Sequence, residues 1–89
     1  FHDGPLPDYA GYNAPAWALM RGERRYGVTW HTVDPSGEVG DILEQELFEI
    51  GPEETALTLN AKCFEAGIRG FERLLEALHG GGPRRRPMP

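Results

Sequence analysis

The 89-residue sequence has a single cysteine, Cys63, and no long apolar run. One cysteine cannot form an internal disulfide or a cysteine-rich zinc site, and it favours a reducing, cytoplasmic setting. No stretch approaches the ~20 apolar residues of a membrane-spanning helix. The start has neither the basic region nor the apolar segment of a signal peptide. The three histidines lack metal-ligand spacing, so we expect no metal site.

Basic residues are also scarce. The formal net charge is −5, and Arg84–Arg86 form a run near the C-terminus, so that the rest of the chain carries 14 acidic and 6 basic residues. Such a body would repel phosphate backbones, and we do not expect nucleic-acid binding. The sequence contains no dinucleotide fingerprint, phosphate-binding loop or nucleophile elbow. Nucleotide-binding and hydrolase functions therefore lack support.

The N-terminal part predicts an ordered loop followed by a short helix. Residues 1–13 are rich in glycine and proline and show no periodicity. Asn13 can cap a helix that ends near Gly22. Trp17 and Met20 are three residues apart, so they share a helix face that we expect to pack on the core.

The middle of the chain predicts a β-hairpin. Residues 26–33 are rich in β-branched and aromatic types, and residues 42–50 carry apolar residues on both faces. The segment 34–37, Asp-Pro-Ser-Gly, is a strong turn signal. We therefore expect two antiparallel strands.

A long amphipathic helix ends the predicted domain. Thr55 is a candidate N-cap, and Gly80–Gly82 with Pro83 form a stop signal. Gly67 and Gly70 indicate close packing, as against a sheet. Residues 80–89 are expected to be a flexible tail, which leaves 1–79 as the domain. Apolar residues recur along one helix face at alternating spacings of four and three: Leu57, Ala61, Phe64, Ile68, Phe71, Leu75 and Leu78.

Three segments carry a resemblance to a known family. They are Phe1-His2-Asp3-Gly4-Pro5-Leu6-Pro7-Asp8-Tyr9-Ala10-Gly11, Gly27-Val28-Thr29-Trp30-His31 and Gly40-Asp41-Ile42-Leu43. In this order they resemble the second half of the catalytic domain of formyltransferases that use 10-formyltetrahydrofolate. The amino-acid sequence is most similar to formylation domains of natural-product assembly lines. The resemblance implies the C-terminal part of a Rossmann-like α/β domain and covers roughly residues 1–79.

The resemblance also implies roles for particular residues. His2 matches the catalytic histidine of the family, whose asparagine would fall one position before Phe1. Glu38 occupies the place of the catalytic aspartate and is one methylene longer, a difference that matters for a precisely held group. The positions in register with the family's folate-contacting segments are Pro5, Leu6, Pro7, Val39, Gly40 and Asp41.

Each of these residues also has an ordinary structural interpretation. A near-terminal His2 can simply be exposed, and Asp41 can accept backbone hydrogen bonds at a strand start. His31 is interpreted as a satisfied strand residue rather than a wall of the cleft, and Cys63 as a small core residue. Between residues 38 and 54 there are seven acids and no base. This run could attract cationic amines or a partner, or it could protect a strand edge by charge.

The sequence thus favours a piece of a formyltransferase that moves a formyl group to an amine of a small molecule or a carrier-bound amino acid. One alternative is a non-catalytic interaction module, and another is a folate-dependent deformylase in which water replaces the amine. We expect the isolated chain to be inactive and only marginally stable, because its apolar surfaces call for the rest of a domain or for self-association.

Overall fold

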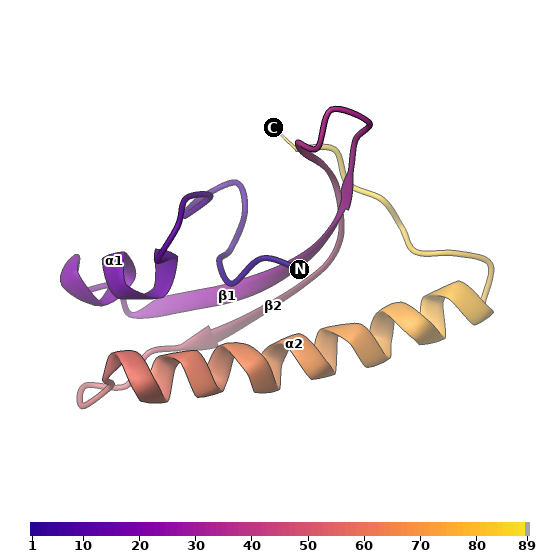
Figure 1. Cartoon of the computed structure of the whole chain (residues 1–89). Coiled ribbons are helices and arrows are strands. Elements are labelled where there is room, and N and C mark those ends of the chain that lie inside the picture. Colours follow the sequence, from indigo (N-terminus) through magenta and orange to yellow (C-terminus); the bar gives the residue numbers. More distant parts are fainter. Residues whose placement is uncertain (89) are drawn as a thin grey trace.

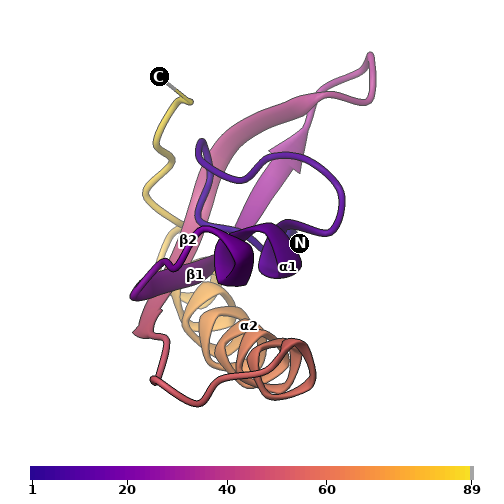
Figure 2. The same cartoon turned by 90° about the vertical axis from the view of Figure 1, so that its left-hand side faces the viewer.

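The computed structural model of the chain describes residues 1–88. Its elements are, in order, α1 (Ala14–Met20), β1 (Arg25–Val33), β2 (Val39–Glu49) and α2 (Ala56–His79). In Figure 1 the strands form a curved ribbon with α2 along one side, and the N-terminal loop and α1 lie along β1. In Figure 2 α1 lies beside the first turns of α2, which it contacts. This is the α/β arrangement of loop, helix, hairpin and helix that the sequence predicts.

The hairpin is antiparallel, as expected, but β2 begins three residues earlier than its apolar pattern indicates. Tyr26 lies opposite Phe48 and Trp30 opposite Glu44, and the register shifts after Trp30. The Asp34 carboxylate closes the turn by accepting the Ser36 hydroxyl at 2.6 Å and two backbone amides. These hydrogen bonds, that of Ser36 foremost, lower the pKa of Asp34. Asp34 is therefore a turn residue.

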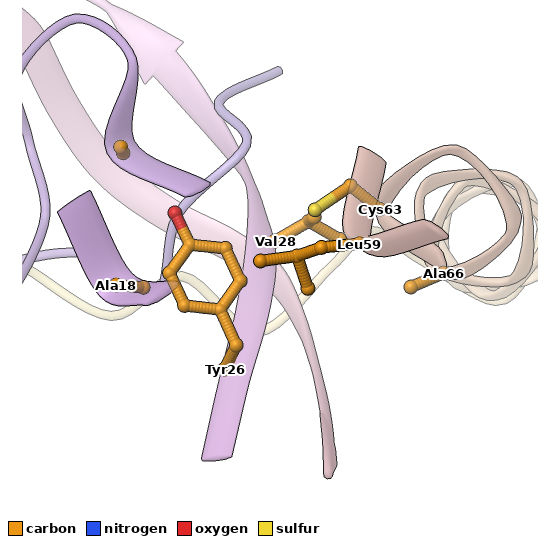
Figure 3. Close-up of a cluster of buried hydrophobic side chains, with 7 residues drawn as sticks. Ala18, Tyr26, Val28, Leu59, Cys63 and Ala66 are labelled. Atoms are coloured by element: carbon orange, nitrogen blue, oxygen red, sulfur yellow. The ribbon is translucent and has the colours of Figure 1, made fainter. Parts of the chain in front are cut away.

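The core lies where α1 and the first half of α2 meet the β1 face. In Figure 3 the Tyr26 ring points towards Ala18 of α1, with Val28 beside the α2 side chains. Burial raises the pKa of the Tyr26 phenol, whose hydroxyl donates to the Asp3 carbonyl at 2.6 Å. Cys63 is buried, which confirms it as a core residue, and this burial raises the pKa of its thiol to about 12. The buried cluster comprises Ala14, Ala18, Tyr26, Val28, Leu59, Cys63 and Ala66.

Helix α2 packs on the ribbon through small residues rather than through its most apolar stripe. Its cap is as expected, because Thr55 and Thr58 form a reciprocal capping box. The Trp30 indole donates to the Gly67 carbonyl at 2.9 Å and packs on Gly70, so the two glycines mark close packing, as predicted. The buried face is Leu59, Cys63, Ala66, Gly67, Gly70 and Leu74.

The stripe with alternating four- and three-residue spacing lies on the exposed side of α2. Phe64 is 70% exposed and Ile68 is 60% exposed, while the glycines that let α2 approach the ribbon lie on the neighbouring face. We name the apolar stripe by its six large residues, all of them exposed: Leu57, Phe64, Ile68, Phe71, Leu75 and Leu78.

For α1, the prediction that Trp17 and Met20 face the core is wrong. Trp17 is half exposed and Met20 is 75% exposed, whereas Ala14, Pro15 and Ala18 are buried. Close approach to Tyr26 and α2 requires small side chains, and that requirement decides which face turns inward. Asn13 is the N-cap through a left-handed backbone, without a side-chain capping bond.

Several carboxylates of the acidic run are paired with bases of the same chain. Arg73 contacts the carboxylates of Glu44 and Glu46, and Arg69 bonds Glu46 at 3.2 Å, which joins α2 to β2. The hydrogen bond from Arg73 lowers the pKa of Glu46. This pairing was not expected from the sequence, because the arginines lie more than twenty residues further along the chain.

The described part of the tail, residues 80–88, returns along β2. Arg86 forms a β-bridge with Ile42 through two backbone hydrogen bonds of 2.7 and 2.9 Å. The Arg85 guanidinium lies 3.0 Å from the Asp41 carboxylate. The predicted flexibility of this segment stays a prediction.

Replacing Gly27 by Ala should destabilise the chain by about 1–3 kcal/mol. A Cβ at Gly27 would lie 2.6 Å from the Glu46 carbonyl oxygen, and that backbone is fixed by the ladder. Gly11→Ala is the matched control, because nothing lies within 4 Å of its Cβ. Urea unfolding followed by circular dichroism checks the difference, and equal midpoints for the two variants would contradict the tight approach of the strands.

Acid should weaken the junction between β2 and α2. The hydrogen bond from Lys62 at 2.5 Å lowers the pKa of Glu54 to about 2. Because the folded-state pKa is depressed, this contribution to stability is present above the unfolded pKa of ~4.3 and disappears as pH falls towards 2. In urea unfolding at pH 6 and pH 2.5, Glu54→Gln should lose less stability on acidification than the unaltered chain. The exposed neighbour variant Glu53→Gln should behave like the unaltered chain.

Candidate functional site

His2 is held in place by its backbone and by its ring. Its amide donates to the Thr29 carbonyl at 2.8 Å, and the Thr29 amide donates back at 2.9 Å. The ring Nε2 lies 2.6 Å from the Tyr9 carbonyl oxygen. The side chain is only 19% exposed. His2 is therefore a fixed, partly buried side chain at the edge of β1.

The loop around His2 is fastened by the buried hydroxyl of Thr29. This hydroxyl donates to the Gly4 carbonyl at 2.8 Å and accepts the Leu6 amide at 3.2 Å. The Gln45 side-chain amide donates to the Leu6 carbonyl at 2.9 Å and to the Thr29 hydroxyl at 3.1 Å. Thr29 is wholly buried. The sequence analysis assigned no role to Thr29 or Gln45. The position of Thr29, a polar residue on the strand face opposite Tyr26, was the one feature of the sequence that could have indicated its role.

The candidate folate-contacting residues fall into two groups along the ribbon. Leu6 is buried with both backbone groups bonded, between a half-buried Pro5 and an exposed Pro7. This Pro-Leu-Pro segment can present a rigid apolar surface to a ligand. The second group begins β2, where the Asp41 amide donates to the Thr32 hydroxyl at 2.8 Å. Gly40 leaves room for that hydroxyl, and Val39 is exposed.

Glu38 lies in the turn between β1 and β2. Its backbone bonds Asp34, and its side chain is exposed. Since His2 pairs with Thr29, the strand from there to Val33 alone spans about 13 Å. The structure therefore brings His2 together with the Pro-Leu-Pro segment, but it does not bring Glu38 to His2.

Two adjoining concavities lie between the N-terminal segment and α2. The histidine hollow, of about 410 Å³, contains both polar and apolar side chains. The apolar groove, of about 350 Å³, opens beside Trp30 and shares Phe1 and Phe64 with the hollow. The hollow is lined by Phe1, His2, Asp3, Asn60, Cys63 and Phe64, and the groove by Phe1, Trp30, Phe64, Gly67, Ile68 and Phe71.

His31 lines neither concavity. Its Nδ1 lies 2.8 Å from the Thr32 carbonyl oxygen, on its own strand. Within residues 1–88, no three metal-binding side chains lie close enough together to hold an ion. Over the same residues, no helix has the length and apolar character needed to cross a membrane.

Comparison with known proteins identifies the family of this chain. The model of the family described as "Formyl transferase" matches residues 1–75. The chain belongs to the formyl transferase family. It is 36% identical over 80 residues to the methionyl-tRNA formyltransferase of Solibacter usitatus (strain Ellin6076), covering 90% of this chain and 26% of that protein. The predicted family resemblance is thus confirmed.

Solved structures of the family share the fold. An N-formyltransferase from Helicobacter canadensis, in complex with folinic acid and dTDP-3-aminofucose, superposes with a TM-score of 0.87 at 23% identity, covering 99% of this chain and 33% of that one. A formyltetrahydrofolate deformylase from Pseudomonas syringae pv. tomato str. DC3000 gives 0.77 at 24% identity, covering 85% of this chain and 26% of that one. The chain therefore spans about a quarter to a third of these relatives.

Replacing Thr29 by Val should loosen the loop that carries His2. The change keeps the side-chain shape but removes the buried hydroxyl that bonds the Leu6 amide, the Gly4 carbonyl and the Gln45 amide. The Leu6 amide and the Gly4 carbonyl then keep only their 3.1 Å bond to each other, and we expect a cost of about 1–3 kcal/mol. Hydrogen exchange should show a less protected Leu6 amide, and urea unfolding should show the lost stability. Thr29→Ser keeps the hydroxyl and should retain the protection. An unchanged Leu6 exchange rate in Thr29→Val would show that the hydroxyl does not hold the loop.

Proposed function

We propose that this chain is part of an enzyme that moves a formyl group from 10-formyltetrahydrofolate to an amine. The observation that carries the proposal is the family match over residues 1–75, together with a His2 held rigidly at the edge of β1. In this reaction a bond forms between the amine nitrogen and the formyl carbon, and the bond from that carbon to the folate nitrogen breaks. The amine gives up one proton, and the folate nitrogen gains one.

His2 is proposed to take the proton from the attacking amine. A fixed imidazole beside an open hollow meets the geometric demand on a general base, which must lie within hydrogen-bond reach of the proton it removes. Glu38 is proposed as the carboxylate partner of His2 only because it aligns with the family's catalytic aspartate. Asn60, on the far wall of the histidine hollow, adds a polar group.

The residues present are proposed to form part of a folate site. The buried Leu6 fixes the Pro-Leu-Pro segment, so Pro5 and Pro7 present apolar surface without a free backbone donor. At the second group, the carboxylate of Asp41 is paired with Arg85, Val39 is exposed, and Gly40 leaves room for the Thr32 hydroxyl. Polar recognition of the pterin is therefore assigned to residues of the remainder of the domain.

The acceptor distinguishes the transferase from a deformylase. Water in place of the amine gives formate instead of a formamide, and one structural relative is a formyltetrahydrofolate deformylase. The acidic body of the chain favours a cationic small molecule or a carrier-bound amino acid over a nucleic acid. A cytoplasmic location agrees with the single buried thiol.

The apolar stripe of α2 is proposed to contact the rest of a larger parent domain. Its side chains are exposed in this chain, and an apolar surface of this extent marks an interaction site. Most of the length of each relative lies outside the matched segment. A non-catalytic role of the chain would use the same surface, so catalysis has to be tested directly.

The direct test measures formyl transfer by the parent protein. With 10-formyltetrahydrofolate and a panel of primary amines, His2→Gln should lower the rate by roughly 10²–10⁴-fold, the usual contribution of a general base. His79→Gln, at the exposed end of α2, is the matched control and should keep full activity. Formate release without an amine would identify the deformylase instead. Full transfer by His2→Gln would remove His2 from the reaction, and the 89-residue chain alone should transfer nothing.

The apolar stripe can be tested on the 89-residue chain by sedimentation. We expect the chain to self-associate, and the double variant Ile68→Asp with Phe71→Asp to stay monomeric, because charge at these positions opposes burial. Glu65→Gln with Glu72→Gln alters two charges beside the stripe, in the opposite direction, and should leave association unchanged. A monomeric unaltered chain with a cooperative, concentration-independent thermal transition would contradict the need for a covering partner.

A further inference from the structure

The hydrogen bond between His2 and Tyr9 determines which ring nitrogen is free. A backbone carbonyl can only accept, so the His2 Nε2, 2.6 Å from the Tyr9 oxygen, must carry a proton. In the neutral ring the other nitrogen, Nδ1, then holds the lone pair. Of the two nitrogens, only Nδ1 can take a proton from a substrate while the bond to Tyr9 remains intact.

The position of Nδ1 agrees with this assignment. It lies 3.9 Å from a carboxylate oxygen of Asp3. Asp3 lines the histidine hollow, whereas Tyr9 does not, so the Nδ1 edge of the ring is the edge that borders the hollow. The Asp3 backbone is fixed as well, because its carbonyl accepts the Tyr26 hydroxyl at 2.6 Å.

Asp3 is the only carboxylate among the residues that line the hollow. The remaining polar groups there are the Asn60 amide and the Cys63 thiol, and burial raises the pKa of that thiol to about 12, which keeps it neutral. Glu38 lies beyond the far end of β1.

We infer that Nδ1 is the proton-accepting atom of His2, and that Asp3 is the carboxylate that positions and balances the ring when it becomes charged. This inference rests on the proposed formyl transfer. The proton leaves the amine nitrogen as its bond to the formyl carbon forms, resides on Nδ1, and passes to the folate nitrogen as the old bond breaks. Asp3 acts through His2 and is a positioning residue.

The first experiment determines the tautomer in the full 89-residue chain. Histidine labelled with ¹⁵N, with His2 assigned by comparison with His2→Gln, should show a protonated Nε2 and an unprotonated Nδ1 at a pH where the ring is neutral. A ring protonated at Nδ1 would overturn the inference. This measurement needs neither substrate nor activity.

The second experiment compares carboxylate variants of the parent protein. Asp3→Asn should lower kcat by about one to two orders of magnitude, less than loss of the base itself, with little change in KM for the amine. Asp3→Glu should recover part of that loss. Asp8→Asn, at an exposed carboxylate of the same loop, is the control and should keep kcat. Glu38→Gln tests the competing partner, and on this inference it should lower kcat less than Asp3→Asn does.

The outcomes separate the inference from the proposed function. Transfer that survives Asp3→Asn but falls in Glu38→Gln would overturn the inference in favour of the partner nominated by the motif, while leaving the formyltransferase function intact. If the unaltered parent protein transfers no formyl group to any amine, both the proposed function and the role of Asp3 fail, whatever the tautomer.

Discussion

The pairing of His2 with Thr29 is the constraint on which the rest of this structure depends. Two backbone hydrogen bonds join the N-terminal segment to the edge of β1, and the Thr29 hydroxyl then fastens the loop that follows. Because the hydroxyl is buried, each partner it holds would cost free energy if left unpaired. A loop with little secondary structure of its own is thereby fixed to the ribbon. His2, the candidate base on this loop, is held rigidly as a result.

Much of the fold follows from local patterns in the sequence. The turn at Asp34, the N-cap at Thr55 and the β-branched run of β1 each specify their structure through neighbouring residues, and each was predicted. The start of β2 was harder to predict, since the strand reaches back to Val39 through the pairing of Val39 with Val33, across an irregular stretch of the ladder.

The faces that pack were harder to predict, for a physical reason. An apolar stripe indicates that a helix face will be buried, but not what will bury it. In both helices most of the residues that pack inside this chain are small, because alanine and glycine allow the backbones to approach. The large residues, Trp17 on α1 and Phe64 on α2 among them, remain on the outside. Long-range ion pairs such as that of Arg73 with Glu44 depend on the finished fold and leave no local signal.

The candidate site shows the same division. The family motif identified His2 and the Pro-Leu-Pro segment, because those residues are contiguous. Thr29 and Gln45 come from different strands and meet Leu6 only once the hairpin has formed. The register of the motif placed Glu38 in the site, whereas its place in a turn follows from the hydrogen bonds of Asp34.

The glycines of α2 also make Trp30 an intrinsic fluorescent probe of helix docking. The Trp30 indole is bonded to the Gly67 carbonyl and rests on Gly70, whereas the only other tryptophan, Trp17, is half exposed on α1. The emission wavelength of Trp30 therefore depends on whether the helix is seated on the ribbon. Replacing Trp17 by Phe would leave a chain whose fluorescence spectrum reports the docking of α2 without any added label.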